Sequence, residues 1–591
     1  MCGIFFLTQA AEEYNNYSIN KIKIAFENGK GRGPDNSVFI HNFSSSNNHY
    51  LPQNNQQYFH LGFHRLSING LDEGSNQPLV IDHVGLICNG EIYNYKKLYN
   101  EHNIVPKTNS DCEVIIHLYL KYGIRKTLQL LHGVFAFVII DDRNTGVAVN
   151  SIKESLDTNH ALSYYRTLPI NKQENSVYDR TVIIARDAYG IRPMFIAENE
   201  NNTFGVSSLL KQLTPLTQAK VKQFQPGTYK QFFYNDGLMV ANAHYNFKSE
   251  LFFSKGMLLN NDEILAACFN VNKYLNEAVK MRVENTDRPV ACLLSGGLDS
   301  SLITALVAKY VPNVKQLNTF SIGMAGASDL EYAKKVAEHL GTNHHEIIVS
   351  EEDFFKAIPN VIKTIESYDT TTVRASVGNY LIGKYISEHC DAKVIFNGDG
   401  SDELFGGYLY MHCAPNSAEF DKESKRLLDN IHFFDVLRSD RCISCHGLEP
   451  RTPFMDINLI GYYLSLSPIL RNHRDNKKLP EKYILRKAFE QDGVLPESVL
   501  WRTKEAFSDG VSNEKNSWHT IIKRRLETHE KEITESPDYI PTLSLEQNYY
   551  KQLFNVCYPD SDHVIPYYWM PNFINATDCS ARSLGIYKEL Q

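Results

Sequence analysis

Residues 289–301 constrain the fold more than any other stretch of the chain. Residues 290–294 form a short apolar run, as expected of a strand buried on both faces. Two adjacent glycines follow, and then residues 301–310, which have the pattern of a helix packed on a sheet. A strand, a glycine-rich turn and a helix start make an anion site, because several N–H groups point one way and the helix dipole favours negative charge. The stretch therefore predicts a phosphate-binding loop.

This loop does not fit the Walker pattern, which needs a Lys-Ser or Lys-Thr pair after its last glycine. The sequence SGGLDS at 295–300 instead resembles the pyrophosphate loops of enzymes that cleave ATP between the α and β phosphates and form adenylates. The alternative is an ordinary turn between a strand and a helix that happens to be rich in small residues.

Length and composition limit the class of protein. A chain of 591 residues predicts two or three domains, and 43% hydrophobic with 22% charged residues is typical of a soluble globular protein. The net charge of −8 gives no sign of a nucleic-acid or anionic-membrane partner. No apolar run approaches the roughly 18 residues that span a bilayer, and the apolar N-terminus lacks a basic region. Eleven cysteines are too dilute for a disulfide scaffold. We expect a cytoplasmic protein.

The first 215 residues have mainly strand patterns. Helical patterns occur at 18–27 and 113–121, and the polar stretches 41–57 and 150–179 are expected to be surface insertions. We expect an antiparallel sheet region with helices, a hairpin from about 224 that leads out of the domain, and a linker at 245–255. The candidate strands are residues 3–7, 58–63, 84–89, 134–140 and 181–186.

Cys2 is a second chemical focus. If the initiator Met is removed, Cys2 carries a thiol and a free α-amine on one residue. The amine titrates near about 7.7–8.0 and the thiol near about 8.5, so one can act as the general base for the other at neutral pH. The alternative is a cysteine that merely follows Met1.

Four further blocks follow Cys2 in order: GRGPD at 31–35, HRLS at 64–67, NGEIYN at 89–94 and SDCE at 110–113. With CGI at 2–4, they resemble the class II, N-terminal-nucleophile glutamine amidotransferases. The resemblance implies an αββα fold in which Arg65 binds the α-carboxylate of glutamine and Asp111 its α-amine. It also implies an oxyanion hole formed by the Asn89 side-chain amide and the Gly90 N–H. By resemblance, the same pocket is lined by Leu66, Ser67, Ile68, Asn69 and Glu91.

From about residue 260, helices and strands alternate. An amphipathic helix is expected at 264–282 and a second at 330–340, which ends at Gly341. This rhythm predicts a doubly wound parallel sheet with helices on both faces and ligands at the carboxyl ends of its strands. Besides 290–294, the expected strands are residues 317–322, 346–349 and 393–397.

Three polar stretches of this half indicate substrate sites. NGDGSDELFGGY at 397–408 holds four glycines and three acids, which suits Mg²⁺ and phosphate, although a solvated acidic turn is the alternative. TTTVRAS at 370–376 places a cation beside hydroxyls, a plausible cradle for a dicarboxylate. WRTKEAFSDG at 501–510 adds Lys504 for phosphate charge. Taken alone, each of the last two stretches is more typical of ordinary surface.

Together these blocks and the 295–300 loop resemble the glutamine-hydrolysing asparagine synthetases, and the tail at 568–582 is similar too. The resemblance implies a glutaminase domain at 2–215 with its hairpin to about 248, a pyrophosphate-loop adenylating domain at 256–540, and a tail at 541–591 packed on the latter. It implies that Thr371 and Arg374 bind aspartate, that Asp299 and Asp402 bind Mg²⁺ and pyrophosphate, and that Lys504 acts at the α-phosphate. By resemblance, ATP binds at Leu293, Ser295, Gly296, Gly297, Asp299, Ser300, Ile322, Asn397 and Gly398.

The implied activity joins two reactions. Cys2 attacks the side-chain amide of glutamine, forms a thioester and releases ammonia. Aspartate and MgATP form β-aspartyl-AMP and pyrophosphate, and the ammonia, passed inside the protein, converts the adenylate to asparagine and AMP. The family also suggests a homodimer.

One departure from the family leaves alternatives open. Members usually carry Ser-Gly-Glu-Gly where this chain has Asn397-Gly398-Asp399-Gly400, and the Glu matters for forming the adenylate. Asp399 is one methylene shorter, and placement errors near 1 Å can cost about 100-fold in rate. A weakened or regulatory pseudo-synthetase is therefore one alternative. A β-lactam-synthetase-like relative is another, but that relative has lost the N-terminal nucleophile. A sugar-phosphate amidotransferase would share only the N-terminal half.

Overall fold

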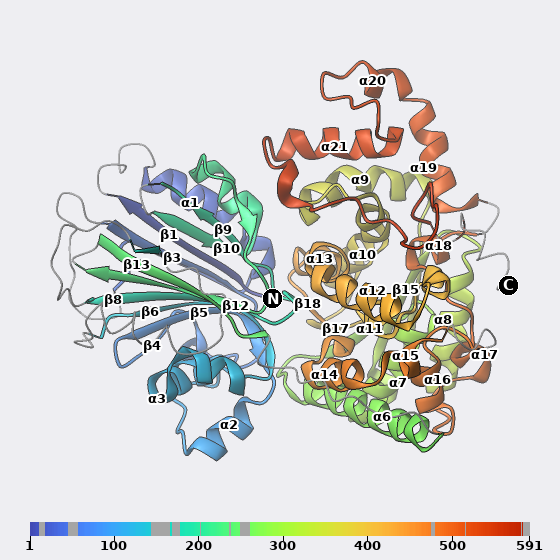
Figure 1. Cartoon of the computed structure of the whole chain (residues 1–591), viewed down its shortest axis with the longest axis horizontal. Coiled ribbons are helices and arrows are strands. Elements are labelled where there is room, and N and C mark those ends of the chain that lie inside the picture. The colour runs from blue at the N-terminus through green and yellow to red at the C-terminus, as the bar shows by residue number, and fades with distance from the viewer. Residues whose placement is uncertain are drawn as a thin grey trace. The chain divides into compact units, whose positions relative to one another are not determined.

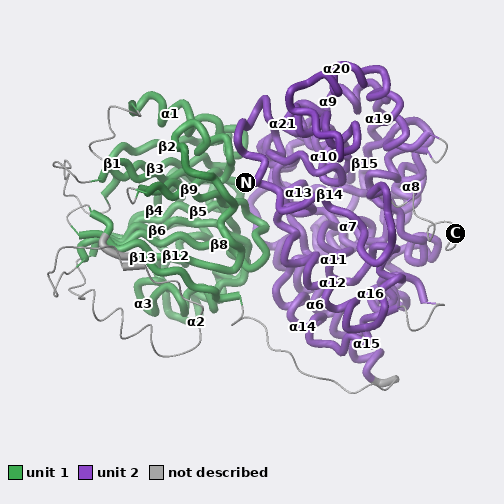
Figure 2. The backbone as a smooth tube through the Cα atoms, turned by 45° about the horizontal axis from the view of Figure 1, so that its top comes forward, with its two compact units in different colours: residues 1–252 green, residues 253–591 purple. Residues whose placement is uncertain are grey.

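The computed structural model describes residues 1–10, 18–44, 57–143, 166–167, 178–200, 203–235, 238–248, 261–473, 479–513, 516–580 and 582. The chain divides into two compact units, Met1–Phe252 and Phe253–Gln591 (Figure 2). We call them the first and the second unit and describe each by itself.

The first unit is built on two antiparallel sheets. The spatial order of the six-stranded sheet is β11 (Lys222–Gln223), β9 (Phe195–Glu198), β10 (Phe204–Ser207), β1 (Gly3–Ala10), β3 (Gln57–Arg65) and β2 (Asn36–Ile40). That of the seven-stranded sheet is β4 (Leu79–Ile81), β5 (Val84–Ile92), β6 (Gly133–Asp141), β8 (Arg180–Arg186), β12 (Thr228–Asn235), β13 (Leu238–Asn246) and β7 (Arg166–Thr167). All five strands expected from the sequence are present, each slightly longer than its apolar run.

Helices cover the outer face of each sheet, so the unit has four layers (Figure 1). Helix α1 (Ile19–Glu27) packs on the first sheet, where Phe26 meets Phe5 edge to face. Helices α2 (Tyr95–His102) and α3 (Glu113–Leu130) share a buried cluster with the second sheet. A separate cluster that includes Ile4 of β1 and Ile87 of β5 joins the two sheets. The expected αββα arrangement is confirmed.

Two boundaries in this unit differ from the sequence expectation. Helix α3 runs beyond residue 121, with a break at Gly123, where φ is +74°. The β12–β13 hairpin does not lead out of the unit, because β12 pairs with β8 and buries Phe232 and Tyr234 against the inter-sheet cluster. Tyr245 therefore belongs to β13 rather than to a linker. Most of the two expected insertions lies outside the described residues.

The second unit contains a five-stranded parallel sheet. Its spatial order is β16 (Asn343–Ile348), β15 (Asn318–Gly323), β14 (Val290–Leu293), β17 (Val394–Phe396) and β18 (Glu449–Arg451). Strand β14 comes first in sequence and lies in the centre, with β15 on one side and β17 on the other. This is the topological switch point of a doubly wound sheet, where ligands bind at the carboxyl ends of the strands. The predicted architecture is confirmed.

Helices surround this sheet (Figure 1). The helices that line a pocket beside the sheet are α7 (Leu298–Tyr310), α8 (Ser328–Leu340), α10 (Thr370–His389), α11 (Ser401–Phe405), α13 (Asp435–Ser444), α16 (Tyr483–Phe489) and α18 (Phe507–Gly510). The others are α6 (Asn261–Glu284), α9 (Glu351–Ile365), α12 (Ser417–Asn430), α14 (Ile457–Ser465), α15 (Pro468–Arg471), α17 (Glu497–Leu500), α19 (Trp518–Glu527), α20 (Glu530–Thr534) and α21 (Leu545–Cys557).

Strand β18 has no counterpart in the sequence expectation. Its Glu449-Pro450-Arg451 sequence shows no strand pattern, and proline cannot donate to a ladder. It fits here because β18 is the edge strand and pairs only with β17 among the described strands. The sheet thus gains a polar edge that the apolar pattern alone did not reveal.

The segment after α21 packs on the second unit. Trp569 lies in a buried cluster with Tyr410 and Phe420, and its ring is 5.3 Å from that of Tyr408. The Trp569 backbone N–H also donates to Asp369, 2.7 Å away, at the N-cap of α10. This part of the tail is therefore an integral layer of the unit.

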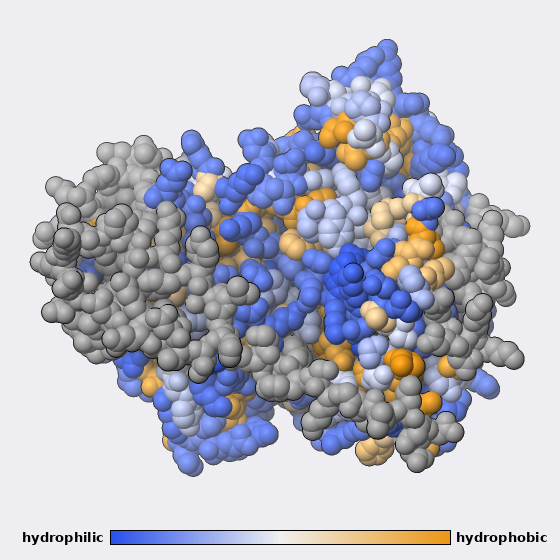
Figure 3. Space-filling model, viewed as in Figure 1, coloured by the Kyte–Doolittle hydropathy of each residue, from blue (hydrophilic) through white to orange (hydrophobic). Residues whose placement is uncertain are grey.

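Hydrophilic residues dominate the described surface in the view of Figure 3, and apolar residues form scattered patches. Large exposed apolar side chains of this kind are common on globular proteins. Among the described residues, no helix combines the length and apolar character needed to cross a membrane.

Candidate functional site

The loop between β14 and α7 has the geometry of an anion site. Gly296 has a φ of +76°, and a Cβ there would lie 2.4 Å from the backbone N of Ala333 in α8. Only glycine fits this position, because a side chain would meet both strain and a clash. Gly297 is the N-cap of α7, and no side chain caps it. The first N–H groups of the helix therefore remain available to a phosphate.

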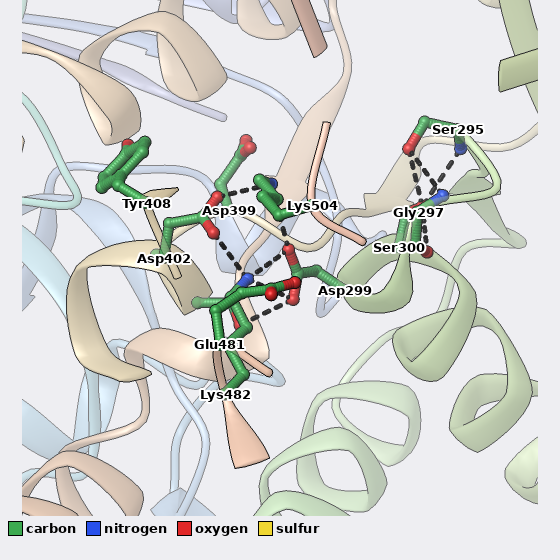
Figure 4. Close-up of polar contacts among 12 residues, drawn as sticks. Ser295, Gly297, Asp299, Ser300, Asp399, Asp402, Tyr408, Glu481, Lys482 and Lys504 are labelled. Atoms are coloured by element: carbon green, nitrogen blue, oxygen red, sulfur yellow. Dashed lines mark hydrogen bonds and ion pairs between the residues drawn. The ribbon is translucent and has the colours of Figure 1, made fainter. Parts of the chain in front are cut away.

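Two serines hold the loop in shape. The Ser295 and Ser300 hydroxyls lie 2.9 Å apart, and the Ser295 backbone N–H donates to the Ser300 hydroxyl at 3.1 Å. The Gly297 N–H donates to the Ser295 hydroxyl at 3.4 Å (Figure 4). The predicted phosphate loop is thus closed by its own side chains.

The carboxyl ends of three strands meet at one pocket. Gly398, after β17, packs so closely on α7 that a Cβ would lie 2.7 Å from the Ser300 backbone N. Ile322 of β15 lies on the same wall. From the sequence-predicted set, the pocket is lined by Leu293, Ser295, Gly297, Asp299, Ser300, Ile322, Thr371, Asn397, Gly398, Asp399, Asp402 and Lys504. Sequence reasoning therefore selected residues that the fold brings together.

Four charged side chains form a cluster at the floor of the pocket, which we call the four-charge cluster: Asp299, Asp402, Lys482 and Lys504 (Figure 4). The Lys482 Nζ lies 2.7 Å from an Asp299 oxygen and 2.6 Å from Asp402 Oδ1. The Lys504 Nζ lies 2.7 Å from Asp402 Oδ2 and 3.5 Å from Asp299 Oδ2. Each ammonium therefore bridges both carboxylates, and the formal charges cancel.

Burial and pairing act together on these groups. Burial raises the pKa of Asp402, but the ammonium groups of Lys482 and Lys504 outweigh it and hold that pKa well below its usual range. Burial lowers the pKa of Lys504, whereas Asp402 and Asp299 raise it well above its usual range. At neutral pH both groups are therefore charged, as a phosphate and cation site requires.

Lys482 was missed by sequence reasoning. It stands alone before the apolar start of α16, in the left-handed conformation with φ +59° and ψ +31°. Its side chain is 1% exposed, and a Cβ on Gly407 would lie 1.9 Å from its Cε. The space around the Lys482 side chain is therefore filled, and a residue larger than glycine at position 407 would displace it. No local motif could have identified it, although a left-handed non-glycine residue often marks a functional site once the structure is known.

Asp399 lines the pocket and pairs with a cation that the sequence did not indicate. The Arg438 Nη2 donates to Asp399 Oδ1 at 2.9 Å and also bonds Asp435. Burial raises the pKa of Asp399, Arg438 opposes the rise and Asp435 adds to it. The Asp399 carboxylate, which occupies the position of the Glu that matters for adenylate formation in the family, is thus oriented by an ion pair with Arg438 of α13.

The two residues predicted to bind aspartate, Thr371 and Arg374, are three positions apart in α10 but differ in their contacts. Thr371 lines the pocket, and its hydroxyl donates to the Trp569 carbonyl at 3.4 Å. Arg374 is not among the lining residues, and its guanidinium makes two-pronged bonds to Glu546 and Asp578 at 2.6–2.8 Å. An aspartate ligand would have to displace these carboxylates. The geometry therefore favours a structural role for Arg374, and its substrate role stays a prediction.

In the first unit, strand pairing brings Cys2 to the predicted glutamine pocket. Gly3 pairs with His64, so Cys2 lies beside the residues that follow β3. Its thiol lies 3.7 Å from the Leu66 carbonyl, and its own carbonyl accepts a 2.9 Å bond from Arg32 Nε. Cys2 is half-buried, and Met1 before it is 1% exposed.

The predicted glutamine-binding residues are buried and held by the same segment. Arg65 donates to the Asn76 side chain at 2.6 Å and to the carbonyls of Asp72, Asn69 and Gly70, which are all neutral oxygens. A cation held by neutral oxygens retains its charge for a ligand carboxylate. Its neighbours Ser67 and Ile68 are also buried.

The acidic residues of this pocket are held in different ways. The Asn69 side-chain amide donates to Glu91 at 2.6 Å, and Asp111 accepts the Ile92 N–H at 2.6 Å. Glu91 and Asp111 are 4% exposed. Glu91 thus belongs to the strand that carries Asn89 and Gly90, and Asp111 is bonded to the end of that strand.

The predicted oxyanion hole includes the side-chain amide of Asn89. Both side-chain polar atoms of Asn89 are buried and have no hydrogen-bond partner among the described residues. Because side chains alternate along a strand, Asn89 shares the face of Ile87, and Cys2 shares that of Ile4. Ile4 and Ile87 meet in the inter-sheet cluster, against which Cys2 packs. A buried amide without a partner is typical of a site that awaits a ligand.

These features define a class. A chain that carries a cysteine at position 2 in a four-layer sandwich and a pyrophosphate loop at the switch point of a parallel sheet has the parts of a glutamine-dependent amidotransferase that uses ATP. The family models agree: the one described as a glutamine amidotransferase domain matches residues 1–151, and the one described as asparagine synthase matches 270–422 and 414–563.

Full-length relatives narrow the class. Asparagine synthetase [glutamine-hydrolyzing] of Gallus gallus is 37% identical, that of Rattus norvegicus 38% and that of Homo sapiens 37%. Each alignment covers 100% of this chain and 99% of the relative. The chain belongs to the glutamine-hydrolysing asparagine synthetase family, which confirms the resemblance seen in its motifs.

Proposed function

We propose that the protein makes asparagine from aspartate, with glutamine as the nitrogen donor and ATP as the energy source. The four-charge cluster beside the 295–300 loop carries the proposal, because its two ammonium groups suit the phosphates of ATP and its two carboxylates suit the accompanying cation. The named relatives are asparagine synthetases, and none of the three is a β-lactam-forming or sugar-phosphate enzyme.

In the first unit, we propose that removal of Met1 frees the α-amine of Cys2. The amine takes the thiol proton, and the sulfur attacks the side-chain amide carbon of glutamine. The Asn89 amide and the Gly90 N–H hold the oxyanion, and ammonia leaves with the proton. Water then hydrolyses the thioester to glutamate. The buried amide of Asn89, which has no described partner, supports this assignment.

In the second unit, we propose that ATP places its phosphates over the 295–300 loop. A β-carboxylate oxygen of aspartate attacks the α-phosphorus, and pyrophosphate leaves. Lys504 stabilises the charge that develops on the α-phosphate. Ammonia then attacks the acyl carbon of β-aspartyl-AMP, and asparagine forms as AMP departs.

Asp299 and Asp402 fit a magnesium ion bound together with a nucleotide. Their carboxylates supply the hard oxygen donors that Mg²⁺ prefers, and both lie within 2.7 Å of the same Lys482 nitrogen. We propose that these two residues hold the ion, which would neutralise phosphate charge when bound.

Thr371 supports aspartate binding on the pocket wall, whereas Arg374 would act on aspartate only after release from Glu546 and Asp578. The homodimer and the cytoplasmic location stay predictions.

A product assay tests the proposal. The full chain is incubated with MgATP, aspartate and glutamine labelled with ¹⁵N in its amide. We expect labelled asparagine, AMP and pyrophosphate in equal amounts, and no pyrophosphate without aspartate. Stimulation by another carboxylic acid would indicate a β-lactam-type enzyme. Absence of all products from folded protein would indicate a pseudo-synthetase.

A further inference from the structure

Residues near the C-terminus contact two elements beside the nucleotide pocket. Asp578 bonds Arg374 of α10 at 2.8 Å, and the Ser580 hydroxyl donates to Asp509 at 2.7 Å. Arg582 Nε donates to Glu505 Oε1 at 2.9 Å. Glu505 lines the pocket and is the neighbour of Lys504. The tail therefore reaches the segment that supplies one ammonium of the four-charge cluster.

A chain of bonds continues from Arg582 to the pyrophosphate loop. The other oxygen of Glu505 accepts a 3.0 Å bond from Arg502 Nη2 and a 2.9 Å bond from the Ser328 hydroxyl. Arg502 Nη1 donates to the Gly296 carbonyl at 3.2 Å. Four residues thus link the tail to the turn that receives phosphate.

Arg502 is fixed on its other sides as well. Its Nη2 donates to Asp329 at 3.0 Å, and its guanidinium lies 4.0 Å from the centre of the Tyr332 ring. Both contacts come from α8, whose Ala333 is the residue that excludes a side chain at Gly296. Any movement of Glu505 is therefore passed to a group that braces the loop directly.

The charged side chains in this chain of contacts are mostly buried, so the loss of one of them should affect the others strongly. The side chains of Arg582, Glu505 and Arg502 are 7%, 10% and 10% exposed. Two guanidinium groups face the carboxylates of Glu505 and Asp329. Loss of Arg582 would remove one positive charge beside the site of a polyanion, in surroundings that screen charge poorly.

Arg582 also holds the backbone of the same segment. Its Nη1 donates to the Asn513 carbonyl at 3.1 Å, and its Nη2 to the Ser512 carbonyl at 3.2 Å. The Arg582 side chain thus bonds both Glu505, the neighbour of Lys504, and the backbone that follows α18. A guanidinium suits this task, because its donors are arranged in a fixed fork.

We propose that Arg582 is a positioning residue for adenylate formation. It holds Glu505, and through Glu505 it sets the placement of Lys504 and the brace of Arg502 on the pyrophosphate loop. The proposal rests on the proposed function of this pocket, and it assigns a role in ATP use to the tail. Arg582 is not expected to touch the substrate.

The test compares Arg582→Gln and Arg582→Lys with the parent, and Arg524→Gln is the matched control. Arg524 pairs with Glu351 in the same unit but is 56% exposed. The readouts are aspartate-dependent pyrophosphate release, glutaminase turnover, melting temperature, and amide hydrogen exchange in peptides covering 502–513 and 295–301 with and without MgATP.

For Arg582→Gln we expect pyrophosphate kcat to fall about 10- to 100-fold, because small placement errors have effects of this size. The KM for ATP should rise, and glutaminase turnover should stay near that of the parent. Exchange in 502–513 should quicken about tenfold, and MgATP should protect 295–301 less. Arg582→Lys should recover part of each effect, and Arg524→Gln should change none.

Two hydrogen-exchange results would overturn the proposal. One is exchange in 502–513 within about twofold of the parent, and the other is faster exchange with a normal pyrophosphate rate and normal MgATP protection. If the parent itself releases no pyrophosphate, the proposed function fails, but exchange and MgATP protection still decide the role of Arg582. A drop in melting temperature with equal loss of glutaminase would show general unfolding and would also refute it.

Discussion

Lys482→Met removes one cation from the four-charge cluster and leaves a side chain of similar length. In the parent, the Lys482 Nζ lies 2.7 Å from both Asp299 oxygens and 2.6 Å from Asp402 Oδ1. The variant leaves both carboxylates to Lys504, which is 3.5 Å from Asp299. Breaking a buried ion pair by removing one partner costs about 3–5 kcal/mol.

The remaining lysine reduces that cost, since Lys504 still bridges both acids. If half of this cost is added to the barrier for pyrophosphate departure, the barrier rises by about 2 kcal/mol and the rate falls about 30-fold. If the full cost is added, the rate falls more than 100-fold. We therefore expect pyrophosphate release to fall about 30- to 1000-fold, and glutaminase turnover to be unchanged.

A second variant separates charge from placement. Gly407→Ala keeps Lys482, but the new Cβ would lie 1.9 Å from its Cε and 2.2 Å from Asp402 Oδ1. The ammonium must then leave its position between the two acids. We expect Gly407→Ala to lower pyrophosphate release by a similar factor without removing any charge.

The assay is aspartate-dependent pyrophosphate release at saturating MgATP, with melting temperature as the check on folding. Lys309→Met is the control, because the Lys309 Nζ bonds Asn276 Oδ1 and lies over the Tyr310 ring, and none of these residues lines the pocket. Rates within threefold of the parent for both Lys482→Met and Gly407→Ala would refute the reasoning. They would mean that Lys504 alone serves the cluster.

Three further changes test other parts of the protein. Cys2→Ala should abolish asparagine formation from glutamine but spare formation from ammonium, and loss of both from folded protein would contradict the two-site reaction. Asp399→Glu restores the family's usual residue and should match or exceed the parent in pyrophosphate release; a large loss would show that Arg438 requires the shorter acid. Burial raises the pKa of Asp329 from 3.8 to about 7, so the folded protein binds more protons between these values and its unfolding free energy falls as pH rises through them. Asp329→Asn should flatten this fall by at most about 1.4 kcal/mol per pH unit, seen as a smaller difference in melting temperature between about pH 5 and about pH 7. An unchanged difference in melting temperature would mean that groups other than Asp329 cause the fall in unfolding free energy with pH.

The phosphate loop could be predicted because every part of it is local. Strand β14, the glycine pair and the start of α7 follow one another within about a dozen residues, and each has its own pattern. The alternation of helices and strands also predicted a parallel sheet with ligands at the carboxyl ends of its strands, whereas the position of the loop at the switch point came only from the strand order. Local pattern thus predicted the fold class and twelve of the residues that line the pocket.

Residues with distant partners could not be found in this way. Lys482 and Asp299 are 183 positions apart, and neither neighbourhood indicates the other. Arg374 looked like a substrate ligand because it stands beside hydroxyls, yet its partners are 172 and 204 positions away. A charged side chain shows its chemistry in the sequence, but only the fold shows which opposite charge has already paired with it.

The place of Arg582 in the order of synthesis has a consequence for incomplete chains. During translation, the first unit, which contains Cys2, is synthesised long before Arg582, the residue that bonds Glu505. Translation that stops early would therefore leave a glutaminase whose synthetase pocket contains every lining side chain but lacks its final brace. Such a fragment would consume glutamine while forming the adenylate more slowly than the parent. Because Arg582 follows every pocket residue in the chain, the full rate of adenylate formation would require translation past residue 582.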